Sequence, residues 1–137
     1  MPADPFDLVR SLDLPQGHYA IFGSGPLIVR GIVGAGNDLD LLSRGPAWTK
    51  ARDAGTTVYL SEFDVEVVSL FDDVVTVGTR WAIGEFDTDE LIDTAERIDG
   101  LPFVRLEHVV RYKRLARRPK DLEHLRLLEA ARAAGHA

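Results

Sequence analysis

The chain has 137 residues, of which 45% are hydrophobic and 28% are charged. This length fits one domain with its own core, and the composition excludes a disordered chain, a collagen-like chain and a pair of large domains. The lack of cysteine excludes disulfides, cysteine-ligated zinc or iron-sulfur sites and a cysteine nucleophile, and it favours a reducing, cytoplasmic location.

The first half of the chain predicts short helices and strands in alternation. The run Gly23-Ser24-Gly25-Pro26 predicts a tight turn into a helix, because glycine permits unusual backbone angles, serine caps and proline suits a first helical turn. The expected elements are a helix over 6–12, a strand over 19–22, a helix through 27–29, a strand over 38–42 and a helix over 46–54.

The second half continues the mixed pattern and ends in two amphipathic helices. The expected elements are paired strands over 57–60 and 63–68 with a turn at 61–62, a weaker strand over 74–84, a helix from 87 to 100, a connection over 101–104, and helices over 106–117 and 120–134. We therefore expect an α/β (or α+β) fold in which helices flank a mixed β-sheet. A single domain over 1–137 would have a core at about 17–104 and a C-terminal helical segment at about 105–135.

The net charge of −6 at pH 7 is unevenly divided along the chain. Residues 1–104 carry seven Lys and Arg against eighteen Asp and Glu, whereas residues 105–137 carry nine against four. An acidic body could hold a metal while the basic segment holds a phosphate-bearing ligand or nucleic acid; the alternative is that the basic helices simply face water. No apolar run approaches the roughly 20 residues of a membrane helix, and the N-terminus has no signal core, so neither a membrane span nor export is expected.

Three acidic residues on neighbouring predicted strands indicate a metal site. Asp38 and Asp40 alternate along one strand and so project from the same face, and Glu66 on a later strand could complete a triangle. Asp64 shares a face with Glu66 and competes with it for the third position. Clustered carboxylates repel one another unless a cation neutralises them, and magnesium prefers carboxylates together with phosphates and water.

The order of these residues resembles the DNA polymerase β-like nucleotidyltransferase superfamily, over residues 19–68. The matching positions are Gly23-Ser24, then Asp38-Leu39-Asp40, and then Val65-Glu66-Val67. The resemblance implies that Gly23 and Ser24 hold a triphosphate and that Asp38 and Asp40 bind two magnesium ions. It also implies that Glu66 helps one ion to activate an acceptor hydroxyl.

The C-terminal segment extends this likeness to small bacterial nucleotidyltransferases of the AbiE type. Its sequence from Tyr112 to Leu122 is similar to the Lys, Arg and Lys-Asp pattern of those proteins, which implies that Lys113 and Asp121 lie beside the nucleotide. The expected activity is transfer of a nucleoside monophosphate from an NTP to a hydroxyl of RNA, protein or a small molecule, with release of pyrophosphate.

Other interpretations remain open. His124 stands where relatives often have an acid, and residues 34–37 lack the usual Arg and Thr, so a catalytically inactive, antitoxin-like module that binds a partner is the alternative. A protein partner or a second copy could also supply the acceptor site. The spacing Gly23-x-Gly25-x-x-Ile28 resembles a dinucleotide-binding fingerprint, but its third glycine is missing.

Overall fold

The computed structural model describes residues 4–34, 36, 38–80 and 85–135 and is built around one seven-stranded mixed sheet. The strand order is β3-β4-β5-β2-β1-β7-β6. The strands are β1 (Tyr19–Phe22), β2 (Leu39–Ser43), β3 (Thr56–Leu60), β4 (Val65–Leu70), β5 (Val75–Gly78), β6 (Glu96–Ile98) and β7 (Leu101–Phe103). Strands β2 and β5 are parallel, as are β1 and β7, and the other neighbours are antiparallel.

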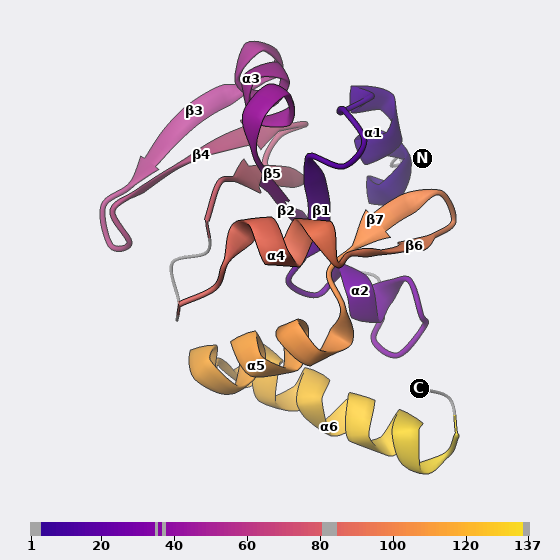
Figure 1. The fold of residues 1–137 in the computed structure, drawn as a ribbon. Coiled ribbons are helices and arrows are strands. Elements are labelled where there is room, and N and C mark those ends of the chain that lie inside the picture. Colours follow the sequence, from indigo (N-terminus) through magenta and orange to yellow (C-terminus); the bar gives the residue numbers. More distant parts are fainter. Residues whose placement is uncertain (1–3, 35, 37, 81–84, 136–137) are drawn as a thin grey trace.

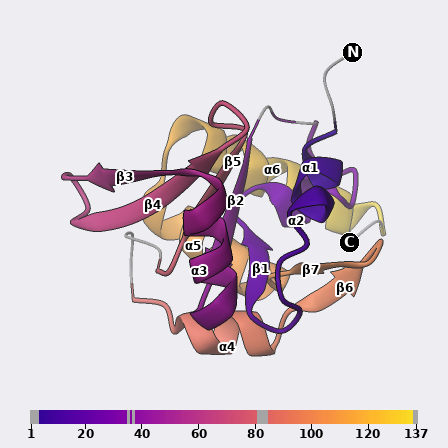
Figure 2. The same ribbon diagram turned by 90° about the horizontal axis from the view of Figure 1, so that it is seen from above.

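Helices cover both faces of this sheet (Figures 1 and 2). The helices are α1 (Pro5–Leu12), α2 (Gly25–Ile28), α3 (Gly45–Ala54), α4 (Thr88–Asp93), α5 (Leu106–Ala116) and α6 (Pro119–Ala133). The expected α/β class, the mixed sheet and the two C-terminal helices are thus confirmed. None of the helices in the described part of the chain is both long enough and apolar enough to cross a membrane.

Alternation along the strands divides the core into two layers. On β2, Leu39 and Leu41 pack in the cluster that contains α1 and α3, whereas Leu42 packs in the cluster that contains α4, α5 and α6. Asp40 has the same parity as Leu42 and therefore projects on the α5–α6 side. The candidate site lies on this side of the sheet.

The segment after α4 differs from the expected helix over 87–100. Helix α4 ends at Asp93, and β6 and β7 form a hairpin whose turn residues Asp99 and Gly100 have φ of 52° and 81°. Asp-Gly with two positive φ values is the turn that two-residue hairpins favour. Pairing of β7 with β1 then buries Phe103 completely, so the predicted connection over 101–104 is mostly a strand.

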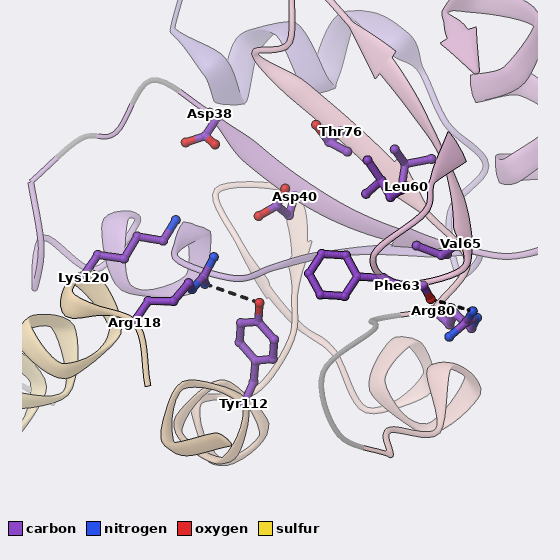
Figure 3. Close-up of a pocket in the computed structure, with 11 residues that line it drawn as sticks. Asp38, Asp40, Leu60, Phe63, Val65, Thr76, Arg80, Tyr112, Arg118 and Lys120 are labelled. Carbon is purple, nitrogen blue, oxygen red and sulfur yellow. Dashed lines mark hydrogen bonds between the residues drawn. The ribbon is translucent and has the colours of Figure 1, made fainter. Parts of the chain in front are cut away.

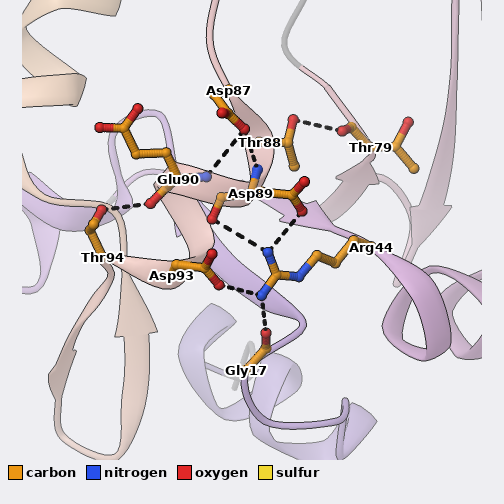
Figure 4. Close-up of polar contacts among 9 residues, drawn as sticks. All are labelled: Gly17, Arg44, Thr79, Asp87, Thr88, Asp89, Glu90, Asp93 and Thr94. Carbon is orange, nitrogen blue, oxygen red and sulfur yellow. Dashed lines mark hydrogen bonds and ion pairs between the residues drawn. The ribbon is translucent and has the colours of Figure 1, made fainter.

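The linker between β2 and α3 anchors α4 against the sheet. Arg44 donates hydrogen bonds to Asp89 at 2.8 Å, to Asp93 at 2.5 Å and to the carbonyl of Gly17 at 2.8 Å (Figure 4). Asp87 caps the helix by accepting hydrogen bonds from the backbone N–H groups of residues 89 and 90. The predicted strand over 74–84 is observed only as β5 over Val75–Gly78; residues 79 and 80 are not part of the strand, and 81–84 lie outside the described part of the chain.

Candidate functional site

The predicted turn after β1 lies directly against Asp40. Gly23 has φ of 65°, and a Cβ atom built there would lie 3.1 Å from Oδ2 of Asp40. Glycine is required at this position both by the left-handed backbone and by the close approach. The structure therefore brings the Gly23-Ser24 turn and Asp40 together.

Asp38 and Asp40 line one pocket with a cavity of about 250 Å³ (Figure 3). Asp38 is exposed just before β2, whereas Asp40 is half-buried within the strand. Burial, followed by the negative charge of Asp38, raises the pKa of Asp40 from 3.8 to about 6, even though nearby cations oppose this change. Two adjacent carboxylates of which one is hard to ionise have the chemistry that a cation would relieve.

The corner between α5 and α6 supplies positive charge on the opposite side of the pocket. Arg118 and Lys120 line the cavity and face the Asp pair (Figure 3). The Arg118 guanidinium is held in place because it donates hydrogen bonds to Tyr112 Oη at 3.3 Å and to Asp121 Oδ2 at 2.7 Å. The Arg-rich run of the sequence contained both cations, but its helical spacing did not show which of them reach the site.

Lys113 and Asp121 form a buried ion pair behind these cations. Both side chains are almost completely inaccessible, and Lys113 Nζ lies 3.2 Å from Asp121 Oδ1. Lys113 also donates to Ser24 Oγ at 3.1 Å, and Nδ1 of His124 lies 3.2 Å from the same hydroxyl. Although burial opposes the change, hydrogen bonds from Arg118 and Lys113 lower the pKa of Asp121. Lys113 therefore lies beside the Gly-Ser turn, and the charges of the pair neutralise each other within the protein.

The expected triangle of carboxylates is not formed. Val65 and Val67 on β4 line the pocket, whereas Val68 packs in the core on the other side of the sheet. Because side chains alternate along a strand, Glu66 projects away from Asp40, and it is exposed. Asp64 instead accepts a hydrogen bond from Tyr59 Oη at 2.5 Å in the β3–β4 turn.

The β5 and β4 positions beside Asp40 on this face carry hydroxyl groups and no carboxylate. Asp40 pairs with Thr76 on β5, and Thr76 pairs with Ser69 on β4, so these three side chains share one row on the same face. Ser69 donates a hydrogen bond to Asp73. Every Asp and Glu of the chain lies in the described part, and there no group of three or more His, Cys, Asp or Glu residues could hold a metal ion.

Most of the remaining wall of the pocket is apolar, and Thr76, Arg80 and Tyr112 complete the lining. The apolar part comes from the β3–β4 hairpin, which projects from the body of the protein, and its residues are Leu60, Phe63, Val65 and Val67 (Figures 1 and 3). The Phe63 side chain points from the hairpin turn toward Asp40 (Figure 3). Phe63 had been assigned to a strand, and its position over the site depends on a hairpin geometry that the sequence pattern did not specify.

The pocket therefore combines a carboxylate pair, the cations Arg118 and Lys120 on the helix side, Arg80 beside the hairpin, and a largely apolar wall. Asp38 and Asp40 supply a donor set that fits one magnesium ion, whose other ligands would be water and phosphate oxygens. The cations opposite fit the phosphate groups themselves. Comparison with protein-family models, curated proteins and solved structures finds no match to this chain.

Proposed function

We propose that this chain binds the magnesium complex of a nucleoside triphosphate in the pocket above Asp38 and Asp40. The observation that carries the proposal is the juxtaposition of two carboxylates with Arg118 and Lys120 across one cavity. Among the described residues, neither Asp38 nor Asp40 forms an ion pair with Arg118 or Lys120. A magnesium ion would neutralise the Asp pair, and phosphates would lie against Lys120 and against Arg118, which already shares Asp121 with Lys113.

The raised pKa of Asp40 supports a cationic ligand. Burial and Asp38 raise its pKa to about 6 although Lys120, Arg118 and Lys113 all act in the opposite direction. The charged carboxylate is therefore not fully compensated by the protein. A divalent ion beside it supplies the missing positive charge, and polarises any phosphate that it binds.

The arrangement of elements supports a nucleotidyltransferase-like fold for this site. The strand β1, the Gly23-Ser24 turn, the short helix α2, and then Asp38 followed directly by β2 with Asp40, stand in the order on which the resemblance rests. The two C-terminal helices then place Lys113 and Asp121 behind the turn. This combination of order and location supports the nucleotide as the ligand rather than a free metal ion.

We propose further that the protein holds the nucleotide without transferring it. Two-metal transfer needs ligands for a second ion, which serves to activate the acceptor hydroxyl. Beside Asp40, β5 offers the hydroxyl of Thr76 and no carboxylate, the Ser69 hydroxyl further along the row is bonded to Asp73, and Glu66 projects from the other face. The domain would then present a bound nucleotide to a partner protein, in keeping with the partner-binding alternative.

Isothermal titration of each NTP with and without magnesium tests the binding site. We expect magnesium-dependent binding in the wild type and its loss in the Asp38→Ala/Asp40→Ala double variant. The matched control is Asp53→Ala/Glu129→Ala, which removes two exposed carboxylates from helices α3 and α6 and should bind as the wild type does. Equal binding by the wild type and the double variant at Asp38 and Asp40 would refute the site.

Nucleotidyl transfer is the second candidate function, and the shared face of Asp38 and Asp40 favours it. Pyrophosphate release from labelled NTPs, tested with RNA, protein and small-molecule hydroxyls as acceptors, separates the two candidates. Magnesium-dependent release by the wild type that is lost in Asp40→Ala would establish the enzyme. Release that appears only in Thr76→Asp, which adds a carboxylate beside Asp40, would instead support the non-transferring interpretation.

A further inference from the structure

Two large apolar side chains are exposed at the mouth of the pocket. Phe63 is 41% exposed and Leu60 is 36% exposed, and both line the cavity that contains the Asp pair. An exposed apolar surface beside a charged pocket is typical of a surface that a ligand covers. A ligand that fits this pocket would place an apolar part against Phe63 and Leu60 and an anionic part near the cations.

The turn that carries Phe63 is held by contacts on both of its sides. Arg80 Nη2 donates hydrogen bonds to the carbonyl oxygens of Phe63, at 3.3 Å, and of Asp64. Within the hairpin, the Phe63 N–H donates to the Leu60 carbonyl at 3.1 Å, and Tyr59 Oη donates to Asp64 at 2.5 Å. The backbone under the exposed ring is therefore fixed in position, which reduces the entropy lost when a ligand contacts it.

The two ends of the pocket differ in chemistry. Arg118 and Lys120 lie at one end, whereas the hairpin end presents Phe63 with Leu60 and Val65 (Figure 3). Arg80 also lies at the hairpin end, where its guanidinium is engaged with the backbone carbonyls of the turn. A nucleotide has the same division, with anionic phosphates at one end and a planar base at the other. Aromatic side chains bind bases of any sequence through their faces.

We propose that Phe63, supported by Leu60, is the platform on which the base of the bound nucleotide stacks; this inference rests on the proposed function. The described residues that line the pocket include no Asn or Gln side chain to read the edge of a base. Arg80 also lines the hairpin side, but its Nη2 already donates to the carbonyls of Phe63 and Asp64. We therefore assign recognition to stacking area, with acceptance of all four bases as its consequence. Purine nucleotides bind more tightly than pyrimidine nucleotides because they cover more of the ring.

Calorimetric titration with Mg-ATP, Mg-UTP and Mg-tripolyphosphate tests this assignment. Tripolyphosphate has the charge of the nucleotide tail but no base. Phe63→Ala is expected to weaken ATP binding by about fivefold or more and to leave tripolyphosphate binding unchanged, while Phe63→Trp keeps ATP affinity. The matched control is Phe71→Ala, which removes a ring of similar exposure from the β4–β5 turn, outside the pocket.

The outcomes separate this inference from the proposed function. Selective loss of ATP affinity in Phe63→Ala, with Phe71→Ala unchanged, supports the platform. If the wild type binds tripolyphosphate as tightly as ATP, or if Phe63→Ala weakens both ligands equally, the platform is refuted while the magnesium-phosphate site remains. If the wild type binds none of the three ligands, the proposed function itself fails and the inference fails with it.

Discussion

Replacing Asp40 with Asn should stabilise the ligand-free protein while removing its nucleotide binding. Raising the pKa of Asp40 from 3.8 to about 6 corresponds to a destabilisation of about 3 kcal/mol when the carboxylate is ionised, at ~1.4 kcal/mol for each pH unit. Asn has nearly the same shape and no charge. The variant should therefore gain a free energy of unfolding of up to about 3 kcal/mol at pH 8, where the wild-type carboxylate is charged.

The difference in stability between the wild type and Asp40→Asn should depend on pH. Below about pH 4 both the folded and the unfolded wild type keep the Asp40 proton, and between about pH 4 and 6 only the folded chain keeps it. Wild-type stability should therefore fall as the pH rises through this range and remain level above it, relative to Asp40→Asn.

Urea denaturation at pH 4, 5, 6 and 8, with EDTA present to remove divalent ions, measures this difference. Asp53→Asn, which removes an exposed charge from α3, should show no such stabilisation. An Asp40→Asn protein that is less stable than the wild type at pH 8, or a difference that is the same at all four values, would refute the reasoning.

Three further predictions separate structural charges from those that bind the ligand. Lys113→Met should lower the free energy of unfolding by about 3 kcal/mol, because Asp121 stays buried without its lysine, whereas Arg126→Met at an exposed ion pair should leave the urea midpoint nearly unchanged. Lys120→Ala should weaken Mg-ATP and Mg-tripolyphosphate by the same factor, about tenfold, and a loss for ATP alone in calorimetry would contradict its role at the phosphates. Glu66→Gln should bind Mg-ATP with wild-type affinity, and a large loss would return this carboxylate to the site.

Local sequence signals predicted much of the fold where they were strong. The Gly23-Ser24 turn between β1 and α2, the alternation of β2 and the break at Pro119 between the last helices all appear at their expected places. The β6–β7 hairpin was missed because Gly100 also fits the end of a helix. Only the pairing of β7 with β1 decides between a helix stop and a hairpin turn, and this contact joins residues about eighty positions apart.

The sequence predicted only those site residues whose positions follow from a single segment of the chain. Asp38 and Asp40 share a face whatever their neighbours do, and the prediction for them required nothing else. The orientation of Glu66 depends on the register of β4 against β5, and a shift of one residue would reverse the face on which it lies. Phe63 and Arg118 reach the pocket from a hairpin and a helix corner, and no local pattern places two such segments opposite each other.

The two groups of charges in this protein differ in how they are compensated. Asp121 accepts hydrogen bonds from Lys113 and Arg118, so that its negative charge is neutralised within the fold. Asp40 forms no ion pair with any described residue, and its nearest acidic neighbour Asp38 makes its ionisation less favourable. A fold selected for stability alone would have neutralised Asp40 as it neutralised Asp121, because the required cations are already close by. Asp40 lacks the partners that neutralise Asp121, and this difference is the strongest physical reason to expect a cationic ligand at Asp40. The gain in stability of Asp40→Asn measures the cost of the unpaired charge directly.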